Sequence, residues 1–172
     1  MIDMKSERNE NSGSEMKKRI LFVCMGNICR SPAAEEIFRS KVAAAGLDDC
    51  YVVDSAGTYP GHRGESPDAR MREAAYRRGY LLTHRARPVA DSDFGDFDML
   101  IAMDDRNYDA LCRLAFTLDD RAKIYRMVEF GSRTDYDHVP DPYYEGREGF
   151  ELVLDLLEDA CGGLLDYTER HL

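Results

Sequence analysis

A short loop between an apolar run and a helical pattern constrains the fold of this chain more than any other feature. The run Ile20-Leu21-Phe22-Val23 is typical of a buried strand, and a helical pattern begins at Pro32. The intervening residues, 24–31, include two cysteines, a glycine, an asparagine and an arginine. Because a helix start presents unpaired backbone N–H groups and a partial positive charge, this strand–loop–helix unit predicts an anion-binding site.

The spacing of Cys24 and Arg30 gives that site a chemistry. Five residues separate them, and their amides can curl around one tetrahedral oxyanion. Gly26 and Asn27 are residue types that tolerate the left-handed backbone that such a curl needs. A helix start and a nearby cation favour the thiolate form of a cysteine, and the guanidinium fork matches two phosphate oxygens. The spacing alone is more typical of a turn with a structural cysteine. The strand before it and the glycine, asparagine, Ser-Pro pair and helix after Cys24 favour a nucleophilic cysteine in an oxyanion-binding loop.

The residues after Arg30 fit the beginning of the helix. Ser31 is predicted to be the N-cap and Pro32 the first helical residue. The Ser31 hydroxyl is also close enough in sequence to donate a hydrogen bond to the cysteine sulfur.

Composition restricts the partners. The 172 residues carry a formal net charge of −10, which argues against nucleic acid or an anionic membrane as a partner. No apolar run approaches the ~20 residues of a membrane span and no signal peptide is visible, so we expect a cytoplasmic protein. The five cysteines show neither paired spacing nor neighbouring histidines, so no metal, no cofactor and no disulfide framework is expected.

The chain divides into a polar tail and a patterned region. Residues 1–17 are nearly devoid of apolar side chains, which predicts a mobile N-terminal tail. Residues 18–172 are expected to form a single α/β domain. Strands are predicted at 19–23, 51–55, 99–103 and 123–126, and helices at 32–45, 67–78, 105–114 and 149–170. Ser66 and Gly79 are the expected cap and stop of the second helix, and Gly162-Gly163 is expected to fray or bend the last.

Residues 23–32 closely resemble the signature loop of the low-molecular-weight protein tyrosine phosphatases. Further matches lie at residues 54–58, 66–70, 84–87 and 139–144, so the resemblance extends from about Lys18 to the C-terminus. It implies a small open sheet of four parallel strands flanked by helices, with the phosphate loop after the first strand. It also implies hydrolysis of phosphotyrosine, or of aryl phosphate monoesters, through a phosphocysteine intermediate.

The resemblance assigns the reaction to three residues. It implies that Cys24 attacks phosphorus, that Arg30 binds the phosphate oxygens, and that Asp141 protonates the leaving oxygen and then activates water. Asp137, outside the Asp141-Pro142 pair, is a less favoured alternative acid. The implied substrate-binding residues are Met25, Gly26, Asn27, Ile28, Cys29, Ser31, Tyr143 and Tyr144. For Tyr144, an exposed loop aromatic is an equally good interpretation.

Two further roles follow from the same resemblance. A hydrogen-bonded support beneath the phosphate loop is implied for Asn27, Ser31, Ser55 and His84, because a strained asparagine requires such support. Oxidation to a Cys24–Cys29 disulfide is implied as protection of the nucleophile against irreversible oxidation. The implied partner is a phosphotyrosine-containing protein or aryl phosphate, bound by a monomer or weak dimer.

One departure concerns the wall of the cleft. Many relatives have a tryptophan soon after the position of Thr58, but this chain has none, and Gly61 falls at that position. Tyr59 and His62 are the residues available to cover the gap.

Two other functions remain open. An arsenate reductase shares this loop but needs two more cysteines in a mobile segment, and residues 82–87 contain none. A non-catalytic phosphotyrosine-binding module would be expected to have lost Cys24, Arg30 or Asp141, and all three are present.

Overall fold

The computed structural model describes residues 16–172, so nearly all of the predicted tail lies outside the described residues. The strands are β1 (Lys18–Cys24), β2 (Tyr51–Gly57), β3 (Met99–Ala102) and β4 (Ile124–Arg126). The α-helices are α1 (Arg30–Ala44), α2 (Ala69–Arg77), α3 (Asp93–Asp96), α4 (Asp105–Leu114), α5 (Leu118–Ala122) and α6 (Arg147–His171). Three single turns of 3-10 helix are η2 (Asp48–Cys50), η3 (Pro60–His62) and η4 (Met127–Phe130).

The four strands form one parallel sheet in the order β2-β1-β3-β4. β1 lies in the middle, with Val23 opposite Ala56 of β2 and Ala102 of β3. The change of direction in strand order on either side of β1 leaves a crevice at its carboxyl end, which is where open α/β sheets bind ligands. Cys24, the last residue of β1, therefore lies at the crevice.

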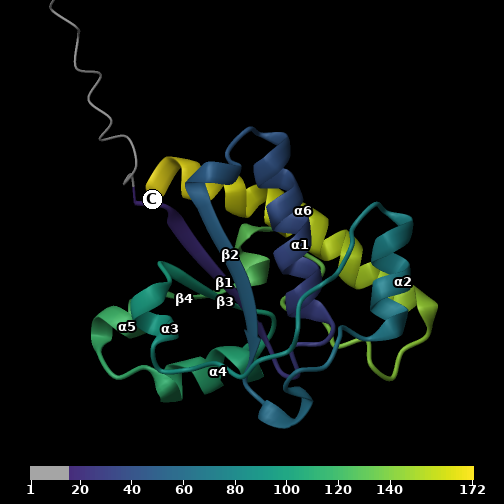
Figure 1. The fold of residues 1–172 in the computed structure, drawn as a ribbon, viewed down its shortest axis with the longest axis horizontal. Helices are drawn as coiled ribbons and strands as arrows, with labels where there is room; N and C mark the ends of the chain where they lie inside the picture. The colour runs from purple at the N-terminus through teal and green to yellow at the C-terminus, as the bar shows by residue number, and fades with distance from the viewer. Residues whose placement is uncertain (1–15) are drawn as a thin grey trace, which may run out of the picture.

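Helices cover both faces of the sheet, with α1, α2 and α6 on one side and α3, α4 and α5 on the other (Figure 1). Alternate residues of β1 point to opposite faces of the sheet and pack into two different cores. Ile20 and Phe22 pack into the core with Phe38 of α1 and Phe150 of α6. Leu21 and Val23 pack into the smaller core with Phe94 and Leu111. Burial on both faces explains why β1 is a continuous apolar run rather than an alternating one.

Two helix starts differ from their predicted caps. Helix α1 begins at Arg30 after an N-cap at Cys29, so Ser31 lies inside the helix and not at its cap. Its hydroxyl is used instead by side chains of the preceding loop. Helix α2 is capped by Asp68, whose carboxylate accepts from the Arg70 N–H, and not by Ser66. Both serines fit the cap preference, but their hydroxyls have other partners, Cys24 and Asn27 for Ser31 and Arg85 for Ser66.

The last helix also differs from its prediction. Helix α6 runs without interruption from Arg147 to His171, so Gly162-Gly163 neither ends nor frays it. Among residues 16–172, no helix has the length and apolar character required to cross a bilayer.

Candidate active site

The loop between β1 and α1 places Cys24 at the base of a cleft of about 260 Å³. Only 3% of Cys24 is exposed, and its Sγ lies 2.9 Å from the Ser31 Oγ. The cleft is lined by Cys24, Met25, Gly26, Ile28, Cys29, Arg30, His62, Asp141, Tyr143 and Tyr144. The structure therefore brings the three predicted catalytic residues into one cavity.

Arg30 is held rigidly at the side of this cleft. Its Nη1 donates to the Asp104 carboxylate at 2.6 Å and to the Val139 carbonyl at 3.0 Å. Burial opposes the charge, but nearby Cys24 and Asp104 outweigh it and raise the pKa of Arg30. Its Nη2 lies 3.8 Å from the Asp141 carboxylate. The guanidinium is thus a permanent, preoriented cation for an oxyanion.

Asn27 organises the loop from beneath. It is the only residue other than glycine with a positive φ among those described, at 56°. Its amide nitrogen donates to the hydroxyls of Ser31 (2.8 Å) and Ser55 (3.0 Å). Its oxygen accepts from His84 Nε2 (2.8 Å) and from the Arg87 N–H (2.9 Å). All four hydrogen-bonding positions of this amide are therefore satisfied.

The side chains of Asn27 and Ser31 lie below the loop and do not line the cleft. They are among the residues predicted to bind substrate, and only their backbone amides remain available for that role. The four residues predicted to support the loop form one hydrogen-bonded cluster.

Beneath this cluster lies a buried carboxylate, Glu35. It accepts from the Ser55 hydroxyl at 2.8 Å and lies 3.1 Å from His84 Nδ1. Burial would raise the pKa of Glu35, but the hydrogen bond and charge of His84, with Ser55 and Arg39, lower it below the ordinary value. A charged carboxylate therefore completes the support of the loop.

Glu35, Asp54 and His84 are close enough to suggest a metal site, with potential ligand atoms within 4.8 Å of one another. Their hydrogen bonds argue for a different interpretation. Asp54 is bound at 2.9 Å by the Arg87 guanidinium, and both ring nitrogens of His84 face acceptors. These cations and N–H groups already balance the carboxylates, so the group fits an ion-pair network rather than a metal centre.

The two cysteines of the loop have different surroundings. Both thiols are free. Burial, and then the neighbouring Cys24, raise the pKa of the Cys29 thiol well above its ordinary value. Cys29 is therefore protonated at neutral pH and unsuited to be the nucleophile, while its position in the cleft leaves it near Cys24.

Asp104 and Asn107 were not predicted to be part of the site. Asp104 both pairs with Arg30 and caps α4 by accepting from the Asn107 N–H at 2.9 Å. The Asn107 amide reaches the phosphate loop, and the orientation that satisfies both of its ends directs its oxygen at the Met25 N–H, 3.2 Å away. The available signal was an aspartate directly after a buried strand, at the carboxyl edge of the sheet where α4 begins.

His62 covers part of the gap left by the missing tryptophan. It lines the cleft, and its ring lies 5.9 Å from that of Tyr59 in an edge-on arrangement. The Tyr59 ring lies so close to Gly61 that a Cβ at position 61 would clash with it. Nδ1 of His62 is 2.7 Å from the Glu65 carboxylate, which fixes the ring against the cleft.

A family model described as low molecular weight phosphotyrosine protein phosphatase matches residues 19–171. The chain belongs to this family. A low molecular weight protein-tyrosine-phosphatase of Streptomyces coelicolor is 45% identical over 153 residues, which cover 87% of this chain and 93% of the relative. The predicted family is thereby confirmed.

Solved structures of phosphatases share the fold. A protein tyrosine phosphatase of Entamoeba histolytica aligns with a TM-score of 0.87 and 44% identity, covering 90% of this chain and 98% of that one. An arginine phosphatase of Drosophila aligns with a TM-score of 0.82 and 33% identity, covering 87% of this chain and 97% of that one. The predicted four-stranded parallel sheet, with Cys24 after its first strand, is confirmed.

Proposed function

We propose that this protein hydrolyses phosphotyrosine in proteins, and related aryl phosphate monoesters, through a phosphocysteine intermediate. The observation that carries the proposal is the single cleft lined by Cys24, Arg30 and Asp141. A nucleophile, an oxyanion-binding cation and a proton donor are the three groups that such a reaction needs.

In the first step the Cys24 thiolate attacks phosphorus. A sulfur–phosphorus bond forms and the bond to the phenolic oxygen breaks, while the loop amides and Arg30 bind the other three oxygens. The departing oxygen takes a proton from Asp141, whose carboxylate lies on the Arg30 side of the cleft. Tyr143 lines the cleft where the aromatic ring of the substrate would lie.

In the second step water hydrolyses the intermediate. Asp141, now deprotonated, accepts a proton from the water as its oxygen attacks phosphorus. The sulfur–phosphorus bond breaks, inorganic phosphate leaves, and the electron pair returns to Cys24. The Ser31 hydroxyl, 2.9 Å from the sulfur, can donate to the thiolate and so make it a better leaving group.

Hydrolysis of p-nitrophenyl phosphate by wild type and Cys24→Ser tests the nucleophile. We expect a burst of p-nitrophenol and a trapped phosphoenzyme for wild type, and loss of turnover for the variant. Substantial activity of Cys24→Ser would contradict the mechanism. Thiol consumption that depends on arsenate, without phosphatase turnover, would favour a reductase instead.

A pair of conservative variants tests the acid. Asp141→Asn should lower kcat by about 10²–10⁴-fold, and the loss should shrink for substrates whose leaving group needs no proton. Asp137→Asn is the matched control, because the Asp137 side chain is 96% exposed and pairs with His138 at 2.6 Å. We expect its kinetics to match wild type. The opposite ranking would transfer the acid role to Asp137.

Because the structurally similar Drosophila protein is an arginine phosphatase, phosphoarginine is a second substrate to compare. The apolar side chain of Ile28 and the ring of Tyr143 in this cleft favour an aromatic substrate over a guanidinium. Phosphotyrosine, phosphoserine and phosphoarginine peptides of one sequence should therefore give the highest kcat/KM for phosphotyrosine. A cytoplasmic location and a monomeric or weakly dimeric state remain predictions.

A further inference from the structure

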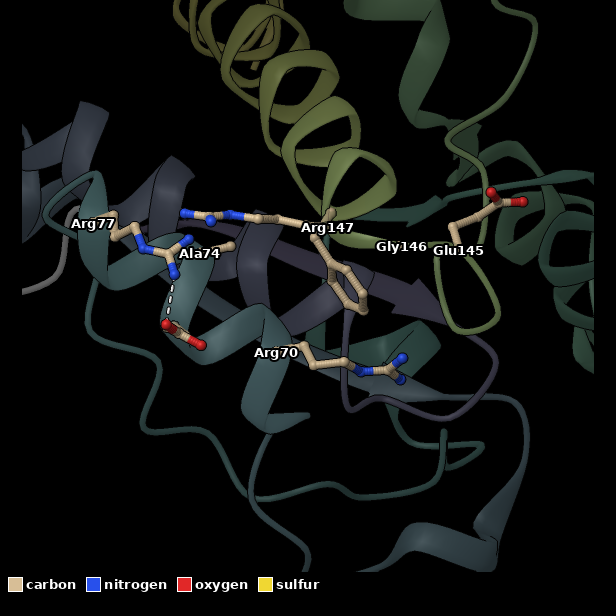
Figure 2. A pocket seen from close by; sticks show the side chains of 8 residues that line it. Arg70, Ala74, Arg77, Glu145, Gly146 and Arg147 are labelled. Carbon is tan, nitrogen blue, oxygen red and sulfur yellow. Dashed lines mark hydrogen bonds and ion pairs between the residues drawn. The ribbon is translucent and has the colours of Figure 1, made fainter.

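A second cavity, of about 430 Å³, lies beside the catalytic cleft between α2 and the start of α6 (Figure 2). It is lined by Arg70, Glu73, Ala74, Arg77, Glu145, Gly146, Arg147 and Phe150. Nη1 of Arg70 donates to the Tyr143 carbonyl at 2.9 Å, and the Tyr143 side chain lines the cleft. Arg70 and Tyr143 thus join the two cavities, and a substrate chain that left the cleft past Tyr143 would reach the second one.

The walls of the cavity are fixed by contacts between its two helices. Arg78, directly after α2, pairs with Glu151 at 2.6 Å and Asp155 at 2.9 Å on α6. The loop that carries Glu145 folds closely against the first turn of α6, where a Cβ at Gly149 would clash with the Glu145 side chain. The cavity is thus preformed, as binding pockets usually are.

The arginines of the cavity are not equally neutralised. Arg70 is held by Asp68 at 2.9 Å, and Arg77 is paired with Glu73. Arg147 forms no ion pair with any of residues 16–172. Its side chain extends from the start of α6 toward α2, whereas the Glu145 carboxylate points away from the arginines (Figure 2). A chain with a net charge of −10 thus keeps an uncompensated guanidinium in a cavity beside its cleft.

The floor of the cavity is apolar. The Arg70 guanidinium lies 4.8 Å from the centre of the Phe150 ring, and Ala74 adds a methyl group. An acidic side chain has two matching parts, because its methylene groups suit the apolar floor and its carboxylate suits the guanidinium fork.

We propose that this cavity binds a glutamate or aspartate side chain of the substrate, a few residues from the phosphotyrosine held in the cleft. The proposal rests on the proposed function and adds a sequence preference to it. The cleft would select the phosphorylated ring, and Arg147 would select an acidic flank.

The test compares kcat/KM for phosphotyrosine peptides that differ only at the flanking positions, which carry glutamate, glutamine or lysine. At low ionic strength, wild type should prefer the glutamate peptide over the glutamine peptide by up to about fivefold, the range of an exposed ion pair. The preference should decrease with added salt, because exposed charges are screened. p-Nitrophenyl phosphate, which cannot reach the cavity, measures the catalytic step in every variant.

Three variants test whether Arg147 causes the preference for the glutamate peptide. Arg147→Gln should reduce the ratio for glutamate over glutamine toward one, and Arg147→Glu should shift the preference to the lysine peptide. Arg113→Gln is the matched control, because this exposed arginine on α4 lines neither the cleft nor the cavity and its loss changes the net charge equally. All three should hydrolyse p-nitrophenyl phosphate at the wild-type rate.

The outcomes separate this proposal from the proposed function. Failure to hydrolyse p-nitrophenyl phosphate would overturn the proposed function, and with it the acidic docking site. Hydrolysis without a preference among peptides would overturn the docking site alone. So would a preference that survives in Arg147→Glu, or one that Arg113→Gln reduces equally through the overall field.

Discussion

Asn27 combines a backbone requirement with a side-chain requirement that no other residue type meets. Its φ of 56° is easy for glycine and costly for most residues, while its amide joins Ser31, Ser55 and His84. Glycine would satisfy the backbone and lose the amide. Alanine would satisfy neither. The two substitutions therefore separate strain from hydrogen bonding.

We expect Asn27→Gly and Asn27→Ala both to lower kcat/KM, because the loop amides lose their fixed orientation. Alanine should cost about 1 kcal/mol more in the free energy of unfolding, the penalty of a left-handed conformation. Steady-state kinetics and urea unfolding of both variants are the measurements. Wild-type kinetics in Asn27→Gly would show that the amide does not support the loop.

Residues whose role lies within the loop could be predicted from sequence, and residues that reach it from elsewhere could not. The spacing of Cys24 and Arg30, with the strand before them and the helix after them, is enough to predict an oxyanion site. Asp104 contacts Arg30 from a position 74 residues away, and its sequence context indicates only a helix cap. The local sequence therefore predicts the helix cap correctly but gives no indication of the contact with Arg30.

At the scale of elements, helix and strand positions were predicted closely, and their ends less so. The positions of β1 and β3 could be predicted because strands of a parallel sheet that is buried on both faces are continuous apolar runs. The short helices α3 and α5, of four and five residues, were missed because they are too short for a periodic pattern. Glycine lowers helix propensity, so Gly162-Gly163 indicates a weak point in the helix, but Gly163 packs against Phe130.

The paired glycines of α6 give a prediction with an internal control. A Cβ at Gly163 would clash with the Phe130 carbonyl oxygen of η4, whereas a Cβ at Gly162 would meet nothing within 4 Å. Gly163→Ala should therefore destabilise the protein by about 1–3 kcal/mol, the usual cost of overpacking. Gly162→Ala should stabilise it by about 0.5–1 kcal/mol through helix propensity. Thermal and urea unfolding measure both, and equal effects would mean that Phe130 of η4 does not pack against Gly163 of α6.

At the scale of the whole molecule, an acidic chain must hold an anionic substrate. The net charge of −10 repels it, so binding depends on local cations and dipoles at the carboxyl edge of the sheet. Arg30 lines the cleft and Arg147 lines the neighbouring cavity, so each provides a local cation. Elsewhere among residues 16–172, acidic side chains pair with other arginines, as Glu35 does with Arg39 and Asp54 with Arg87.

Glu35 links the stability of the whole fold to the support of its phosphate loop. Because its pKa is lowered in the folded protein, the folded state binds the proton less tightly than the unfolded chain does. The stability that Glu35 contributes is thus fully present above the ordinary glutamate pKa of 4.5, and it is lost as the pH falls through the lower folded value. Protonation would also remove the negative partner of His84 beneath Asn27.

Urea unfolding of wild type, Glu35→Gln and Glu36→Gln between pH 7 and pH 3 measures this contribution. The gap in stability between wild type and Glu35→Gln should be largest at neutral pH and should close in acid, because wild-type Glu35 then carries no charge either. Glu36 occupies the next position of α1 and contacts the same Arg39, at 3.1 Å, but it does not contact His84. Its variant should follow the wild-type curve. A constant gap for Glu35→Gln across the range would mean that the buried carboxylate supports the loop through its shape and hydrogen bonds, and not through its charge.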